Sequence, residues 1–464
     1  MAQAQKKSGG SLHKVAFLLI ILAVIATGVY IYSSRIEPAN VQRIKPIIPA
    51  PTWDLTKFNS GQNPYRHYET ALAYVSGADS ETLANYLAQQ RTNYRDEDRV
   101  TQEQYQTALK NTQPAIPEVL LGASCSIKNY VFPEKPASAE ALFPEFAQLR
   151  GLARVVVADA ADKAQQGKIS ASANELLALM EMGNDVSTGP SMIGYLVGVA
   201  VKSIAARPLM DLLNAPKITA RDYRQIAKEL GRINFERPTL RQALESEYHF
   251  CRGSVLEILN YDSKRLNEVM TGDSESSSGT KLSAAYLAIP GMKSRTVRNF
   301  DKAWQAMLAN CDKPYAEAMQ FDVRKHVPKN DIINRMLLPA FNGVRAKDAQ
   351  DAAVIRGLML VAALQAYRLE HGNCPATLQD LVDKGYISRV PFDPYANNQA
   401  FKYTRRTDGY LLYSIGADMT DDGGKIVKPF YQIGSDQQGK LIRGDIVFAP
   451  GLDIWSKPPK KRHP

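Results

Sequence analysis

The chain has 464 residues, 45% hydrophobic and 22% charged, a composition that excludes wholesale disorder, a collagen-like rod and a polytopic membrane protein. Its 57 Lys and Arg against 47 Asp and Glu give a net charge of +10, which does not by itself require nucleic acid, and no nucleic-acid partner is predicted. The length suffices for two or three domains with their own cores.

The N-terminal region predicts a membrane anchor. Residues 1–14 are basic, and the next 18 residues, Val15 to Tyr32, carry no charge. As a helix this run reaches about 27 Å, close to the thickness of the hydrocarbon core. It is longer than the apolar region of a cleaved signal peptide, the alternative interpretation, and it ends in Tyr30-Ile31-Tyr32 rather than small residues. We therefore expect a cytoplasmic tail over 1–14 and a single transmembrane helix over 15–32, with the C-terminal bulk outside the cytoplasm.

Residues 33–52 are rich in proline and predict a semi-extended spacer. From 53 to 345 the sequence predicts a helical domain of paired helices joined by short turns. One helix is expected over Phe146 to Gln166, with Gly167 ending it.

Two pairs of residues have the spacing of a capping box at the start of a helix: Ser172 with Glu175, and Thr219 with Asp222. The apolar run Ile193 to Val201 is only nine residues long, too short to cross a bilayer, and predicts a buried core helix.

Two segments are too polar to pack. Residues 271–283 predict a mobile loop that divides the helical domain, and residues 456–464 form a basic, Pro-rich tail.

Around Asp348 the pattern changes to that of an α+β domain, predicted over 346–455. Ala352 to Glu370 reads as one helix, which His371-Gly372 ends, and a shorter helix follows. The hairpin signal Asp408-Gly409 lies between two β-prone runs, and Ile446 to Phe448 adds a third. The predicted fold class is therefore mainly α, with an N-terminal transmembrane helix, a helical region, and a C-terminal long helix packed on a small antiparallel sheet.

This C-terminal segment resembles the C-terminal domain of the major pseudopilins of type II secretion. The shared pattern is a helix ending in Tyr, Gly and Pro, then spaced leucines, an Asp-Pro-aromatic turn, aromatic strands, and a Gly-Ala-Asp…Gly-Gly…Asp-Ile loop. The matching residues are Tyr367, Gly372, Pro375, Leu378, Leu381, Asp393 to Tyr395, Tyr403, Tyr413 to Asp418, Gly423, Gly424, Asp445 and Ile446. The resemblance covers roughly residues 350–450, and the whole layout is similar to uncharacterised bacterial envelope proteins that join an anchor, a helical region and a pseudopilin-like end.

The chain departs from pseudopilins near its N-terminus. Their processing site, Gly-Phe followed by Thr-Leu-x-Glu, has as its nearest equivalent Gly10 to Val15, without the aromatic residue or the glutamate. Their anchor is also continuous with the long helix, whereas here the helical region separates the two. An ordinary pseudopilus subunit is therefore not predicted.

The resemblance implies calcium binding in the acidic loop, since the major pseudopilins bind calcium there. Asp418, Asp421, Asp422 and Asp445 are the expected ligands, and carboxylate oxygens suit a hard cation. The alternative is that Asp-Asp-Gly-Gly forms a solvated turn.

The motifs indicate no catalytic constellation and no cofactor site. Histidines lack metal-ligand spacing, and the one near-match to a P-loop, Gly434 to Lys440, is followed by Leu441 instead of Ser or Thr. The four cysteines permit up to two disulfides, of which Cys251–Cys311 is the preferred pairing, or else are buried small side chains.

The leading hypothesis is a membrane-anchored, extracytoplasmic interaction or assembly protein of the bacterial inner membrane and periplasm, associated with a type II secretion or pilin-like system. Its expected partners are other envelope or pilin-like proteins or further copies of itself. The alternative is a membrane-tethered envelope hydrolase with a site in the helical region.

Overall fold

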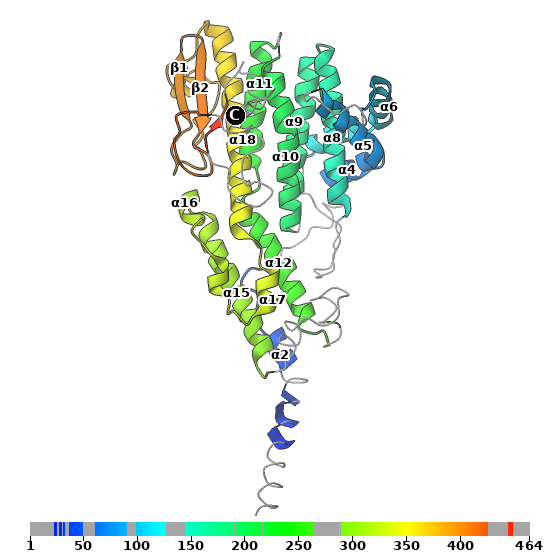
Figure 1. Ribbon diagram of the computed structural model, residues 1–464, viewed down its shortest axis with the longest axis vertical. Coiled ribbons are helices and arrows are strands. Elements are labelled where there is room, and N and C mark those ends of the chain that lie inside the picture. Colours follow the sequence, from blue (N-terminus) through cyan, green and yellow to red (C-terminus); the bar gives the residue numbers. More distant parts are fainter. Residues whose placement is uncertain are drawn as a thin grey trace, which may run out of the picture.

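The computed structural model of the protein is mainly helical, with one small antiparallel sheet (Figure 1). It describes residues 23–25, 27–29, 31–32, 37–49, 61–90, 99–126, 144–189, 191–215, 217–262, 265, 287, 289–425 and 444–448. The expected tail over 1–14, the loop over 271–283, the near P-loop match over 434–440 and the basic tail over 456–464 lie outside these residues.

The described helices, in chain order, are α2 (Glu37–Gln42), α4 (Pro64–Leu72), α5 (Gly77–Gln89), α6 (Gln102–Thr112), α7 (Ala115–Ser124), α8 (Pro144–Gln165), α9 (Ile169–Ser187), α10 (Met192–Leu213), α11 (Ala220–Glu236), α12 (Leu240–Ile258), α15 (Met292–Cys311), α16 (Tyr315–Ala318), η3 (Val323–His326), α17 (Ile332–Leu337), α18 (Phe341–His371) and α19 (Gln379–Asp383). The strands are β1 (Lys402–Arg406), β2 (Gly409–Ser414) and β3 (Ile446–Val447), which pair antiparallel in the order β1-β2-β3.

Local sequence signals explain many of the helix ends. The side chain of Thr219 accepts a hydrogen bond from the backbone N–H of Asp222, and Asp222 accepts one from the N–H of Thr219, so this predicted capping box is confirmed. Gly167 follows α8 with a φ of 76°, and Gly372 ends α18 with a φ of 74°; both stops are confirmed.

The helix predicted from Ile193 to Val201 is confirmed as part of α10, which packs directly on α9. Gly198 makes the close approach possible, because a Cβ there would overlap the carbonyl oxygen of Gly183 and the Oγ of Ser187. The apolar run thus serves helix packing inside the protein.

Apolar side chains form two large clusters. The first joins α4 to α11 with α18 and the sheet, and the second joins α12, α15 and the first turns of α10 and α18 around Trp304, whose indole N–H donates to the carbonyl oxygen of Leu244 at 3.0 Å. Figure 1 shows these clusters as upper and lower parts of an elongated molecule, and α18 runs from one into the other.

The C-terminal sheet lies against α18. Phe448, just after β3, packs its ring on Gly357 so closely that a Cβ at Gly357 would overlap it. Residue 346, where the α+β domain was expected to begin, lies inside α18, and this helix belongs to the same apolar cluster as α9, α10 and α11.

Four expectations about local structure were wrong. Residues 33–52 were expected to form a semi-extended spacer, but Glu37–Gln42 forms the helix α2, and the Glu37 carboxylate accepts a hydrogen bond from the backbone N–H of Lys293 at 2.8 Å. Ser172 and Glu175 lie inside α9, which begins at Ile169, because the tight turn at Gly167 starts the helix sooner and Glu175 turns inward to Lys163. The long helix starts at Phe341 rather than Ala352. The expected Cys251–Cys311 disulfide is absent from the described part of the chain, and all four cysteines are buried.

Within the described ranges, one helical segment, Ile332–His371, is long and apolar enough to cross a membrane, but 72% of its most apolar window is buried inside the protein. At the N-terminus, the described residues between 23 and 32 are helical, and this segment projects from the lower end of the molecule (Figure 1). Its side chains are uncovered: Val24 is 67% exposed and Ile25 is 55% exposed.

Candidate functional site

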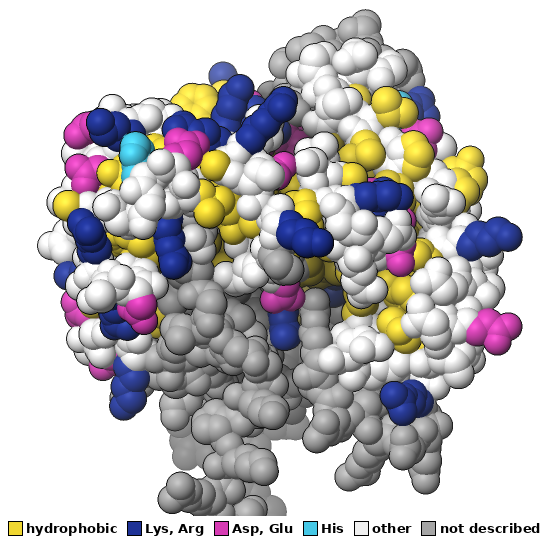
Figure 2. All heavy atoms as spheres, turned by 90° about the horizontal axis from the view of Figure 1, so that it is seen from above, with side chains coloured by type: hydrophobic (Ala, Val, Ile, Leu, Met, Phe, Trp, Pro, Cys, Tyr) yellow, Lys and Arg dark blue, Asp and Glu magenta, His cyan; other side chains and the backbone are white. Residues whose placement is uncertain are grey.

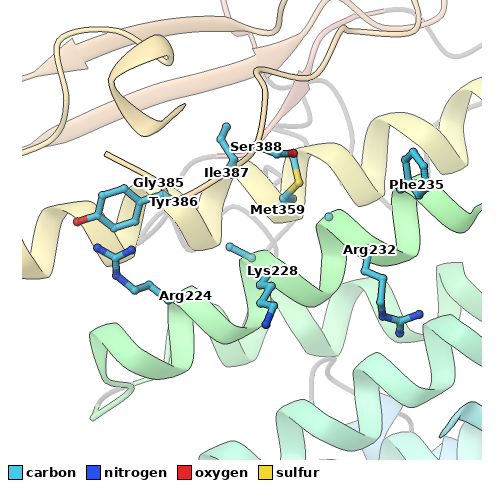
Figure 3. A pocket seen from close by; sticks show the side chains of 11 residues that line it. Arg224, Lys228, Arg232, Phe235, Met359, Gly385, Tyr386, Ile387 and Ser388 are labelled. Carbon is cyan, nitrogen blue, oxygen red and sulfur yellow. The ribbon is translucent and has the colours of Figure 1, made fainter. Parts of the chain in front are cut away.

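An open groove runs between α11, α18 and the loop over 385–388 (Figure 3). We call it the α11–α18 groove; its volume is about 670 Å³. The side chains that define it are Arg224, Lys228, Arg232 and Phe235 on α11, Met359 on α18, and Tyr386 and Ile387 on the loop. The four residues of α11 recur every three or four positions, so they occupy one face of the helix.

One end of the groove is fixed by a charged and aromatic cluster. The guanidinium of Arg224 binds both carboxylate oxygens of Glu370, at 2.7 and 2.6 Å, and lies 3.8 Å from the centre of the Tyr386 ring. The Tyr386 hydroxyl donates to the same carboxylate at 2.6 Å. The hydrogen bonds from Arg224 and Tyr386 lower the pKa of Glu370 to about 2, so the carboxylate stays charged at neutral pH.

At the other end of the α11–α18 groove, an aromatic ring is exposed to solvent. Phe235 is 81% exposed, although burying such a side chain would gain about 1.5–3 kcal/mol. Next to it, Arg232 is held by Glu181, Glu229 and Glu236. Lys228, between the two ends, makes no ion pair with a carboxylate of the described residues. The groove therefore offers an apolar anchor point at Phe235 and, as far as the described residues go, a cation without an ion pair at Lys228.

A buried ion network fixes α10 and α11 against α18 below the groove. Arg237 and Arg345 each contact the carboxylate of Asp348, at 2.6 and 2.7 Å, and the Tyr195 hydroxyl donates to it at 2.7 Å. Burial alone would raise the pKa of Asp348, but the two arginines outweigh it and lower the pKa to about 2.

The second half of this network is an ion pair inside the protein. The Nζ of Lys202 lies 2.6 Å from Oδ2 of Asp351, and both side chains are only 2% exposed. Since α10 supplies Lys202 and α18 supplies Asp351, the pair fixes the relative position of these helices. The sequence showed no sign of this network, because Tyr195 and Lys202 of α10 lie 153 and 149 residues before the carboxylates of α18 that they contact.

The four predicted calcium ligands of the acidic loop lie near the end of β2 and the start of β3. Most of their carboxylates already accept hydrogen bonds from backbone N–H groups. Asp418 accepts from the N–H of Gly444 at 3.0 Å, and Asp445 accepts from that of Gly424 at 2.7 Å. Asp421 accepts from the Tyr413 hydroxyl at 2.9 Å.

These carboxylates do not form a metal shell as they stand. Among the described residues, no group of three or more Asp, Glu, His or Cys side chains is arranged to hold a metal ion. One observation favours a cation: Asp445 is 1% exposed, and its Oδ1 has no hydrogen-bond partner. Burial, followed by the charges of Asp421 and Asp422, raises the pKa of Asp445, and a cation would reverse this effect. Calcium binding by Asp418, Asp421, Asp422 and Asp445 stays a prediction.

The turn Asp393-Pro394-Tyr395 is hydrogen-bonded to the end of β2, close to the acidic loop. Asp393 is buried and accepts from the N–H of Tyr395, the hydroxyl of Ser414 and the N–H of Ile415. These bonds, of 2.8–3.0 Å, tie the turn to the end of β2. A matching residue of the pseudopilin-like pattern thus has a structural role.

The helical region contains one buried group of ionisable side chains that bears on the hydrolase alternative. Lys163 lies between Asp159 and Glu175, and the side chain of Glu175 is 2% exposed. Burial, opposed by Lys163 and supported by Asp159, raises the pKa of Glu175 to about 8. Glu175 therefore binds a proton more readily than an exposed carboxyl group. Its burial leaves a substrate no access, and the hydrolase alternative stays a prediction.

Comparisons of this chain with protein-family models, with curated proteins and with solved structures found no match.

Proposed function

We propose that this protein is a membrane-anchored, extracytoplasmic interaction protein of the bacterial envelope, and that it binds a partner protein through the α11–α18 groove. The observation that carries the proposal is Phe235, 81% exposed at one end of a groove that also contains arginine and tyrosine side chains. Aromatic and arginine side chains supply most of the binding energy at protein interfaces. The structure already holds this groove open, so a partner would not pay for rearranging it.

The anchor in this proposal is the N-terminal helix. Its described apolar side chains are exposed, and Figure 1 shows the helix projecting from the folded body, as expected if lipid surrounds it. The inner membrane as its location, with the C-terminal bulk in the periplasm, is part of the proposal. The pseudopilin-like pattern supports partners from a type II secretion or pilin-like system, or a second copy of the chain.

Calcium has a supporting role in this proposal. A Ca²⁺ ion at the acidic loop would give the unpaired Oδ1 of Asp445 a partner and would stabilise the sheet next to α18. We expect the full-length protein to unfold at a higher temperature with millimolar Ca²⁺ than with EDTA, and the Asp445→Asn variant to lose most of this difference. An equal melting temperature with and without Ca²⁺ would exclude the site.

The proposed function is tested by photocrosslinking in cells that express the full-length chain. A photoreactive phenylalanine analogue at position 235 should give a crosslinked product with one pilin-like protein or with a second copy, identified by mass spectrometry. The same analogue at Met336, which is 46% exposed but lies away from the groove, serves as the matched control. Lys228→Glu should reduce the product formed at position 235, because Lys228 lines the groove.

Two results would count against the proposal. Products at position 235 that match those at position 336 would show that the groove has no specific partner. A mature N-terminus near residue 33, found by mass spectrometry, would exclude the anchor.

A further inference from the structure

A second pocket lies between the C-terminal end of α18 and the turn that joins β1 to β2. We call it the arginine pocket; its volume is about 510 Å³, and Arg368, Arg405 and Arg406 line it together with Asn373, Cys374 and Asp408. In Figure 1 this part of the molecule lies at the end away from the N-terminal helix. Figure 2 views that end and shows Lys and Arg side chains crowded along its upper edge.

The walls of the arginine pocket are held together by contacts within the fold. The Tyr403 hydroxyl of β1 donates to the carbonyl oxygen of Pro375 at 2.7 Å, which ties the strand to the segment after α18. Arg405 and Arg406 are in register with Tyr410 and Gly409 of β2, so the hairpin fixes their backbone. Cys374 lines the same pocket as Arg368 and Arg405; burial raises the pKa of its thiol, and the charges of these two arginines lower it.

The charge in this pocket is not compensated. No ion pair joins Arg368, Arg405 or Arg406 to a carboxylate of the described residues, in contrast to Arg224 and Arg232 in the α11–α18 groove. Glu370, two residues after Arg368, binds Arg224 and Tyr386 instead. Asp408 is the one acid among the lining residues, so the three arginines leave a net charge of +2.

The helix dipole explains the position of one of the three arginines but not of the other two. Arg368 lies in the last turn of α18, where a cation interacts favourably with the helix dipole. Arg405 and Arg406 belong to a strand, where no such effect applies, and all three arginines are exposed. Their position around one pocket that contains a single carboxylate favours an anionic ligand.

We propose that the arginine pocket binds a phosphate monoester group. Such a group carries a charge of about −1.5 to −2 at neutral pH and three strong acceptor oxygens, which match the net charge of +2 and the arginine side chains that line the pocket. The pocket volume of about 510 Å³ is in the range of small-molecule sites, so it also has room for the organic part of the ligand. The group can come from a soluble phosphate ester or, since the pocket lies at the end away from the N-terminal helix, from the headgroup of a phosphatidic acid lipid in a second membrane.

The test uses the full-length protein in detergent micelles for soluble ligands and in nanodiscs for lipid. Isothermal titration with phenyl phosphate measures the soluble source, and co-sedimentation with vesicles of phosphatidylcholine with or without phosphatidic acid measures the lipid source. We expect saturable binding in one of these two arms. Arg405→Ala and Arg406→Ala should each raise Kd roughly ten-fold or more, because each removes a charge-assisted bidentate contact. Arg405→Lys should recover only part of the affinity, since an ammonium cannot form the bidentate contact.

Arg298→Ala is the matched control, because Arg298 is an exposed arginine of α15 outside the pocket, and its binding should equal that of the unmodified protein. The proposal is overturned by the absence of binding in both arms, by binding that Arg405→Ala and Arg406→Ala leave unchanged, or by benzoate binding as tightly as phenyl phosphate. Circular dichroism of each variant separates loss of binding from loss of fold. This site does not overlap the α11–α18 groove, so crosslinking at position 235 succeeds or fails independently of it.

Discussion

Replacing Lys202 with methionine should lower the free energy of unfolding by about 3 kcal/mol, because the change leaves Asp351 as a buried carboxylate without its main partner. Lys202 Nζ lies 2.6 Å from Asp351 and 3.1 Å from Oδ1 of Asn184. Removing one partner of a buried ion pair costs about 3–5 kcal/mol. Arg237, 3.5 Å from the same oxygen of Asp351, still offsets part of the charge, so the lower end of this range applies.

The measurement is equilibrium urea denaturation of the full-length protein in detergent at pH 7, followed by circular dichroism. The double variant Lys202→Met with Asp351→Leu should be more stable than Lys202→Met alone, because it leaves no unpaired carboxylate. Lys228→Met makes the same change at an exposed position without an ion pair and should alter stability by less than about 0.5 kcal/mol. A loss below about 1 kcal/mol for Lys202→Met, or a double variant less stable than the single one, would refute the reasoning.

Two further predictions concern the packing of α9 and the proton on Glu175. Gly198→Ala should destabilise the protein by about 1–3 kcal/mol, since its Cβ overlaps the carbonyl oxygen of Gly183, whereas Gly343→Ala, with nothing within 4 Å, should be neutral or stabilising in the same urea assay. Glu175→Gln should reduce the dependence of stability on pH between the ordinary pKa of 4.5 and the raised value of about 8. In this window the folded protein keeps a proton on Glu175 that the unfolded chain releases, so the unmodified protein loses stability as the pH rises; melting temperatures across the window measure the effect. Equal losses of stability in Gly198→Ala and Gly343→Ala would contradict the packing account. A melting temperature of Glu175→Gln that depends on pH as strongly as that of the unmodified protein would contradict the account of the proton.

Local patterns in the sequence predicted local structure well. The cap at Thr219, the stop at Gly167 and the hairpin at Asp408-Gly409 depend on side chains and backbone angles within a few residues, so one stretch of sequence contains the whole cause. The same holds for the end of α18 at Gly372.

The errors arose where distant residues determine the outcome. The helix predicted from Ala352 begins at Phe341, and its additional charged residues Arg345, Asp348 and Asp351 pair with one another, with Lys202 of α10 and with Arg237 just after α11. The α11–α18 groove was missed for the same reason, because the loop over 385–388 meets α11 only in the folded protein. The arginine pocket likewise needs α18 and the β1–β2 turn together.

The 31 residues of α18 form a continuous rod about 46 Å long. Its first turn lies in the cluster around Trp304, and its last turn borders the arginine pocket. Because this rod packs against α10, α11 and β2 along its length, it fixes the spacing between the cluster around Trp304 and the arginine pocket at the opposite end of the molecule.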